Sequence, residues 1–180
     1  MLKYIILLAT VVSFLLFVIS GCQPAPAEPI RDVEEPLVED IGEVETHGVG
    51  ETVTVGDIVW EVTEVEDLGT EIILEDREAL QPRVGRFLAV SFFIQNLGEE
   101  TRTIFDLTLI DDQGRTYQIC LESIAFFEPE EACVLQEIIP EVENNYAASF
   151  DVEIDAEGLI LQVTDLRIPA QEVAYIELGI

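Results

Sequence analysis

An alternating run of apolar residues constrains this chain more than any other feature. The run lies in the string RFLAVSFFIQN, residues 86–96, and its members at every second position are Leu88, Val90, Phe92 and Ile94. An extended backbone places four such side chains on one face of a sheet. The run therefore predicts a central β-strand.

Comparable alternation recurs after residue 51, with turn residues such as Gly56-Asp57, Asp111-Asp112-Gln113-Gly114 and Gly158 between the runs. The expected strands carry the sets Ile58, Trp60, Val62; Phe105, Leu107, Leu109; Tyr117, Ile119, Leu121; Ala148, Phe150, Val152, Ile154; Leu159, Leu161, Val163; and Val173 to Leu178. Trp60 stands in register with Ile58 and Val62, which favours a place in the core over a ligand-stacking platform.

The segment 122–143 is less regular, with one helical turn expected at Ser123–Phe127 and a strand at Cys133–Ile139. Short strands separated by frequent turns, with no long helical pattern, are typical of a sandwich. The sequence thus predicts an all-β fold over residues 51–180, an antiparallel immunoglobulin-like β-sandwich of about seven to nine strands.

The charge of the chain limits its partners. Asp and Glu number 37 against 8 Lys and Arg, a formal net charge of −29, while 49% of the residues are apolar. Disorder needs low hydrophobicity as well as high charge, so the chain should fold with an acidic surface. Because nucleic-acid binding depends on Lys and Arg at phosphates, we expect no nucleic-acid partner.

The N-terminus resembles a lipoprotein signal. Lys3 precedes an apolar run from Tyr4 to Ile19, and Ile19-Ser20-Gly21-Cys22 is similar to the lipobox of bacterial lipoproteins. The pattern predicts a signal peptide at 1–21 and lipidation of Cys22, which would anchor the protein to the membrane outside the cytoplasm. The alternative is an uncleaved membrane anchor with an incidental cysteine.

Residues 22–50 read as a lipidated cysteine followed by a flexible acidic tether. Pro24, Pro26 and Pro29 disfavour helix, and eight acids between Glu28 and Glu45 oppose the single Arg31. The one histidine, His47, falls in this predicted linker, where it is expected to be inert.

Four strings resemble a telokin-like, immunoglobulin-like domain of uncharacterised bacterial lipoproteins and secreted proteins. They are VGDIVWEVTEVEDLG, GRFLAVSFFIQNLGEE, LTLIDDQGRTY and AASFDVEIDAEGLILQVTD, and the likeness covers most of 53–180. Its elements are Val55-Gly56-Asp57, Gly85, Asn96, the Asp111-x-x-Gly114 turn and Phe150-Asp151-Val152. The resemblance implies the fold and an extracytoplasmic location, and the chain departs from it between Leu121 and Asn144.

Cys120 and Cys133 remain after lipidation. In an extracytoplasmic β domain an even pair favours a disulfide, with two free buried thiols or a redox or metal role as alternatives. With one histidine and these two cysteines, copper and zinc are disfavoured. Calcium remains open, because Glu153-x-Asp155-x-Glu157-Gly158 imitates the start of a calcium loop, although Thr164 stands where a bidentate Glu belongs. No other cofactor is expected.

The sequence offers no nucleophile with a histidine partner in the folded region and no phosphate loop, so we expect no enzyme. The leading hypothesis is a lipid-anchored extracytoplasmic protein that presents an immunoglobulin-like module to a protein or envelope component. The alternative is a structural or cation-responsive acidic envelope lipoprotein with no specific protein ligand.

Overall fold

The computed structural model describes residues 46–73 and 78–180, and within them it contains eleven strands and one short 3₁₀ helix. The predicted signal peptide, Cys22 and most of the predicted tether lie outside the described residues. Among the residues it does describe, no helix is long and apolar enough to cross a membrane.

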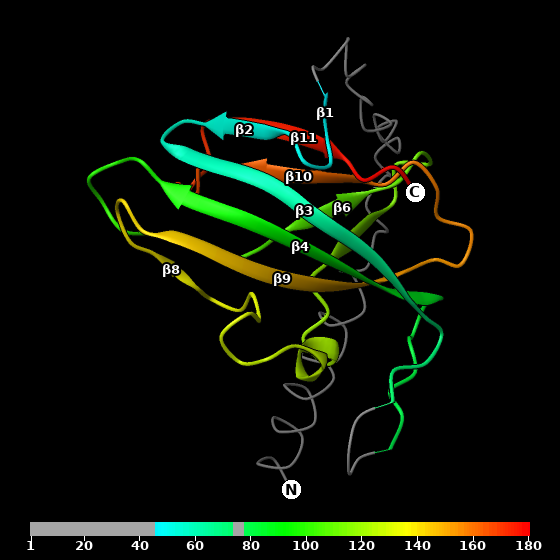
Figure 1. Ribbon diagram of the computed structural model, residues 1–180. Coiled ribbons are helices and arrows are strands. Elements are labelled where there is room, and N and C mark those ends of the chain that lie inside the picture. Colours follow the sequence, from blue (N-terminus) through cyan, green and yellow to red (C-terminus); the bar gives the residue numbers. More distant parts are fainter. Residues whose placement is uncertain (1–45, 74–77) are drawn as a thin grey trace, which may run out of the picture. The chain divides into compact units, whose positions relative to one another are not determined.

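The elements follow one another in a simple order (Figure 1). They are β1 (Thr46–Gly48), β2 (Thr52–Val55), β3 (Ile58–Gly69), β4 (Arg86–Asn96), β5 (Arg102–Thr103), β6 (Thr108–Ile110), β7 (Thr116–Gln118), η1 (Ser123–Phe126), β8 (Glu137–Ile138), β9 (Glu143–Val152), β10 (Ile160–Thr164) and β11 (Val173–Glu177).

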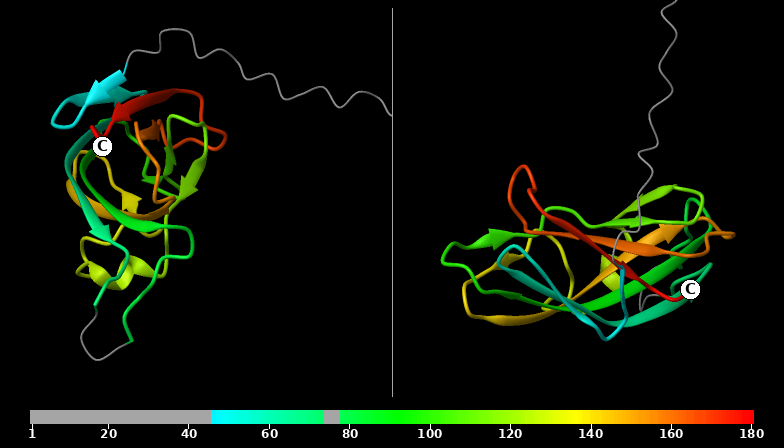
Figure 2. Two further views of the ribbon diagram at one scale, coloured as in Figure 1. Left: turned by 90° about the vertical axis from the view of Figure 1, so that its right-hand side faces the viewer. Right: turned by 90° about the horizontal axis from the view of Figure 1, so that it is seen from above.

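Two sheets face one another across the core (Figure 2). One has the order β2-β3-β4-β9, the other the order β1-β11-β10-β6-β7, and β5 pairs separately with β8. The pairings are antiparallel except that of β1 with β11, which is parallel. Strands β6, β10 and β11 thus have the C-F-G order of an immunoglobulin domain, and the predicted antiparallel immunoglobulin-like sandwich is confirmed.

The central strand β4 has the bounds predicted from its alternation. Its even-numbered apolar residues join a core cluster with Trp60, which is 0% exposed, and with Phe150 and Leu161 from β9 and β10. Strand β3 contains a register shift, typical of a β-bulge, between Val62 and Glu64. The helical turn expected near Ser123 is η1.

Several boundaries differ from expectation. Strand β1 lies inside the predicted tether, since Thr46 pairs with Tyr175 and His47 with Ile176, so the folded part of the chain begins before residue 51. The expected strand Cys133–Ile139 is reduced to β8. Phe105 and Leu121, predicted to line the core, are exposed, because β6 and β7 are only three residues long.

Candidate functional site

The predicted calcium ligands are not brought together in the structure. Strand β9 ends at Val152, and the carboxylate of Asp155 pairs with Arg115 at 2.9 Å. The backbone carbonyl of Glu157 accepts a hydrogen bond from the Asp112 N–H at 3.0 Å. Nowhere in residues 46–73 and 78–180 do three acidic, Cys or His side chains come together to hold a metal ion, and calcium binding by Glu153, Asp155 and Glu157 stays a prediction.

Cys120 and Cys133 are both free thiols in the structure, and the predicted disulfide stays a prediction. Their backbone N–H groups donate to β9 only two residues apart, to the carbonyls of Ser149 and Ala147 at 2.7 and 2.8 Å.

The side chains of this pair nevertheless point to opposite faces. Ile119 forms a β-bridge with Phe150, a core residue. Cys120 is the next residue along the chain, and its side chain therefore faces outward. Ala132 bridges Ala147, which neighbours the core residue Ala148, so Cys133 turns into the core, where it is 1% exposed. Burial raises the pKa of the Cys133 thiol to about 12. The number of residues between the two cysteines does not indicate which face each side chain takes, so this difference could not be predicted from the sequence.

A buried carboxylate closes the hairpin between β6 and β7. Asp111 accepts hydrogen bonds from the backbone N–H of Gln113 and Arg115, from Arg115 Nε at 2.5 Å and from the Tyr117 hydroxyl at 2.8 Å. Burial acts to raise the pKa of Asp111, but the bonds from Arg115 and Tyr117 outweigh it and lower the pKa below its ordinary value. Burial and the bond to Asp111 raise the pKa of Tyr117 to about 12.

Other residues of the resemblance also hold the fold together. The Asp151 carboxylate accepts from the backbone N–H groups of Arg83, Val84 and Gly85, which fixes the entry to β4. The buried Asn96 side chain donates to the carbonyls of Glu100 and Ile138 at 2.7 and 3.0 Å, which ties the loop after β4 to β8. These positions of the resemblance are therefore explained by the hydrogen bonds that they make within the fold.

His47 and the buried serines lie in different elements of the fold. His47 lies in β1, paired with Ile176. Ser123 and Ser149 are buried, bond to each other through their hydroxyls, and share the Cys120 carbonyl as acceptor. These serines act as links between η1 and β9.

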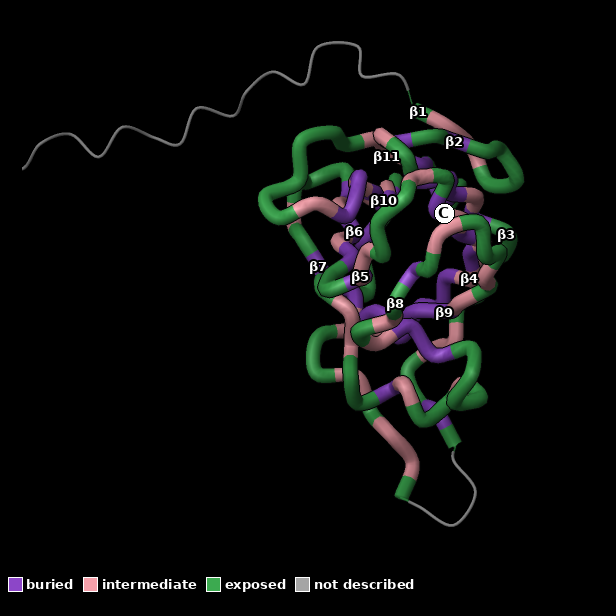
Figure 3. The backbone as a smooth tube through the Cα atoms, turned by 90° about the vertical axis from the view of Figure 1, so that its left-hand side faces the viewer, coloured by how far each residue is buried: buried purple, intermediate pink, exposed green. Residues whose placement is uncertain are grey.

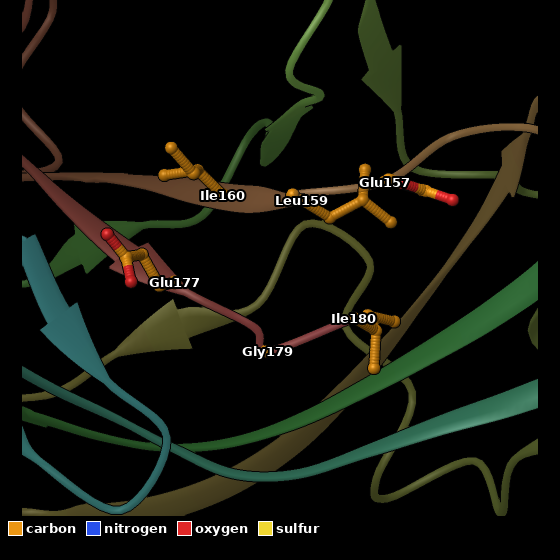
Figure 4. Close-up of a pocket in the computed structure, with 7 residues that line it drawn as sticks. Glu157, Leu159, Ile160, Glu177, Gly179 and Ile180 are labelled. Atoms are coloured by element: carbon orange, nitrogen blue, oxygen red, sulfur yellow. The ribbon is translucent and has the colours of Figure 1, made fainter.

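One depression lies beside the end of β11 (Figure 4). It measures about 630 Å³, and Leu159, Ile160 and Ile180 line it together with Glu157 and Glu177. Its charged side chains are both carboxylates, so it offers apolar surface and negative charge.

Two further depressions adjoin at the opposite end of the sandwich. They measure about 360 and 460 Å³ and share Thr103, Phe105, Leu166, Arg167 and Ile168, which we name the loop groove. The first two of these residues come from the segment between β4 and β6, and the other three from the loop between β10 and β11. Figure 3 looks onto this end, where exposed loops surround the buried strands.

The groove presents apolar side chains to solvent. Ile168 is 77% exposed and Phe105 58% exposed, whereas their neighbours Leu166 and Ile104 are buried. The buried neighbours fix each loop to the core, so the exposed side chains stand on anchored backbone.

Asp165 organises the loop between β10 and β11. It is 2% exposed, and its Oδ1 accepts from the backbone N–H groups of Arg167 and Gln171 at 3.3 and 3.2 Å. The Leu166 N–H donates to Thr164 Oγ1 at 3.2 Å. Hydrogen bonds within the loop therefore fix the backbone on both sides of Ile168.

Two guanidinium groups border the groove. Arg167 lies 3.4 Å from both Asp57 and Asp165, and Arg102 lies 3.0 Å from the exposed Glu100. Neither arginine was singled out by the sequence, and Phe105 was assigned to the core. The signal in the sequence for Ile168 is that it is an apolar residue next to Pro169 in a loop.

The fold and this loop end define a class of protein, an immunoglobulin-like β-sandwich with an exposed groove between two loops. No protein-family model matches the chain, and no curated protein matches it.

Solved structures do match it. The yjhA protein from Bacillus subtilis is 14% identical, with 74% of this chain and 100% of that chain covered and a TM-score of 0.57. A conserved hypothetical protein from Bacillus anthracis is 13% identical, covering 72% and 89%, with a TM-score of 0.50. MPT63, a secreted protein from Mycobacterium tuberculosis, is 12% identical, covering 77% and 99%, with a TM-score of 0.47. At these identities the likeness to the first two structures shows the fold alone.

Proposed function

We propose that this protein is a lipid-anchored extracytoplasmic protein whose immunoglobulin-like domain binds a protein or another envelope component through the loop groove. The proposal includes no catalytic step. Its N-terminal part rests on the lipobox ending at Cys22, together with the resemblance to lipoproteins and secreted proteins. Its binding part rests on the groove.

The exposed apolar pair Phe105 and Ile168 is the observation that carries the proposal. Large apolar side chains that stand together on ordered loops mark interaction surfaces. The loops are those that follow strands in the B and F positions, and in variable immunoglobulin domains the loops at this end bind antigen. That parallel is an analogy of fold, and the exposed side chains supply the physical reason.

The alternative of a cation-responsive envelope protein gains no support from the described residues, since their acids form no cluster suited to a metal. A surface with net charge −29 is explained by solubility and self-repulsion. We therefore develop the binding hypothesis.

Photo-crosslinking in intact cells tests the binding part. A photoreactive amino acid replaces Ile168 in one strain and Ile154, which is also exposed but lies at the other end of the sandwich, in a second strain. We expect a crosslinked species of defined mass from position 168 alone. Equal labelling from both positions, or none from 168, would contradict the proposal.

The anchor is tested separately. Globomycin, which blocks lipoprotein processing, should leave a larger precursor in the membrane fraction, and Cys22→Ala should release or mislocalise the protein. A precursor whose size does not change with the inhibitor would show that the N-terminus is not processed as a lipoprotein.

A further inference from the structure

We propose that the loop groove takes an extended peptide segment of a protein partner that carries a single carboxylate beside a large apolar side chain. This inference rests on the proposed function and adds the chemistry of the occupant. It combines three properties of the groove: its open shape, its apolar pair and its two guanidinium groups.

The shape favours a chain segment over a small molecule. Small-molecule pockets bury most of their ligand within a closed cleft. Here the two depressions are open to solvent and share five of their lining residues. Their sides also present polar groups of Thr108, Gln162 and Thr164, which can bond to a peptide backbone. An open, partly polar groove suits an extended peptide.

The apolar pair supplies the anchor for the partner's apolar side chain. Phe105 and Ile168 both line the groove, one from each loop. Because Asp165 and Leu166 already hold the Ile168 loop in place, little conformational entropy is lost when a partner docks. Aromatic and aliphatic side chains presented in this way are typical binding anchors.

Arg167 is the stronger candidate to hold the carboxylate. Its contacts with Asp57, Asp165 and Gln171 are 3.2 to 3.4 Å long. Two other arginines make shorter contacts of 2.5 Å, Arg86 with Asp67 and Arg115 with Asp111. A guanidinium has five N–H donors and prefers the bidentate geometry of a carboxylate. Arg167 is therefore the less tightly engaged group, and its side chain remains 31% exposed at the groove.

Arg102 provides a second cation on the rim. Its partner is Glu100, whose side chain is 76% exposed and held by this one 3.0 Å contact. An incoming carboxylate can exchange with that of Glu100 at little cost, because exposed pairs contribute less than about 1 kcal/mol.

The charge of the chain limits how acidic the occupant can be. The groove is lined by Glu100 and Asp106 as well as by the two arginines, and Arg167 also pairs with Asp57 and Asp165, so the groove carries no surplus of positive charge. A chain of net charge −29 repels polyanions at long range. One carboxylate fits these conditions, whereas a polyphosphate or an acidic run does not.

The experiment uses the full-length protein in detergent and a matched set of labelled peptides. Each short N-acetylated, C-amidated peptide has a central Leu or Phe, and the neighbouring position carries Glu, Gln or Lys. Affinity is measured by fluorescence anisotropy at two salt concentrations. We expect Glu peptides to bind about fivefold tighter than their Gln counterparts and Lys peptides to bind weakest, with the Glu preference shrinking at high salt.

Variants assign this preference to the groove. Arg167→Gln should reduce the Glu-over-Gln ratio to less than about twofold, Arg102→Gln should reduce it in part, and Ile168→Ser should weaken Glu and Gln peptides alike. Arg83→Gln and Ile154→Ser are matched controls away from the groove and should change neither value. Native Trp60 fluorescence confirms that each variant is folded.

A Glu-over-Gln ratio near one, a preference for Lys, or a ratio untouched by Arg167→Gln would overturn the inference. So would crosslinking of position 168 to a glycan. Crosslinking of position 168 to a protein while the peptides show no Glu preference would leave the proposed function standing and reject only this inference. Absence of crosslinking at 168 would instead remove the proposed function.

Discussion

The indole Nε1 of Trp60 donates a hydrogen bond to the backbone carbonyl of Thr164 at 3.0 Å. Trp60 belongs to β3 in one sheet and Thr164 ends β10 in the other, so this bond joins the two layers from within the core. Phe92 packs beside the indole with ring centroids 5.5 Å apart. Thr164 also begins the loop that carries Ile168.

Replacement of Trp60 should therefore destabilise both the core and the loop end. We expect Trp60→Ala to lower the free energy of unfolding by about 3–5 kcal/mol, and Trp60→Phe by about 1–3 kcal/mol, because Phe leaves the Thr164 carbonyl without its donor. Denaturant titration followed by circular dichroism measures both. Phe105→Ala, at an exposed aromatic, should change stability by less than about 0.5 kcal/mol; a comparable loss there would contradict the exposed position of Phe105, and a loss below about 1 kcal/mol in Trp60→Ala would contradict the core position of Trp60.

Asp111 should make stability depend on acid pH. Because its folded pKa lies below the ordinary value of 3.8, its contribution is complete above that value and is lost as pH falls through the folded pKa. We expect Asp111→Asn to be less stable than the parent by about 1.5–3 kcal/mol at pH 7. The difference should shrink as pH falls below about 4.

Asp112→Asn is the control for this measurement, because Asp112 is the exposed neighbour in the same turn. Its stability should track the parent at every pH. A difference between Asp111→Asn and the parent that stays constant down to pH 2 would show that the Asp111 charge is not what stabilises the hairpin.

Gly85 should tolerate no side chain. A Cβ there would lie 2.3 Å from the Ile154 nitrogen and 2.6 Å from the Val152 carbonyl oxygen, both backbone atoms. We expect Gly85→Ala to cost more than about 3 kcal/mol, since backbone must move. Gly114→Ala, in open space at φ 75°, should cost about 1–2 kcal/mol from backbone strain alone. Thermal unfolding ranks the two, and the reverse order would refute the close approach at Gly85.

The two thiols should differ in reactivity. The thiolate is the reactive form, so the buried Cys133, whose pKa is raised to about 12, should resist alkylation in the native protein. We expect iodoacetamide to modify Cys120, which is partly exposed, well before Cys133, as read by peptide mass mapping. A Cys120–Cys133 disulfide peptide in the non-reduced digest would show instead that the pair bonds.

The fold was predictable where side chains alternate without interruption. The bounds of β4 follow from Leu88, Val90, Phe92 and Ile94, because the pleat alone decides which face each residue takes. Strand β1 could not be found in this way. Its sequence Thr-His-Gly has no apolar pattern, and it exists through its pairing with β11, a tertiary contact.

The loop groove was beyond the sequence for a related reason. Phe105 fits the alternation of Leu107 and Leu109, but the chain breaks phase between β5 and β6, so Ile104 is buried and Phe105 is exposed. Ile168 and Arg167 sit in a loop without periodicity, and their approach to Phe105 depends on how β10 and β6 pair. The faces that Cys120 and Cys133 occupy were equally hard to predict, since a single-residue shift decides which face each thiol takes.

The parallel pairing of β1 with β11 determines how the domain would respond to mechanical tension. Three register pairs, from Thr46–Tyr175 to Gly48–Glu177, join this strand to its sheet. If the chain ahead of Thr46 is tethered as proposed, a pull from the envelope reaches these pairs before any other pair of the described residues. Strand β1 would separate first and lengthen the linkage, while Trp60 and the sheets around it remained folded and carried the force.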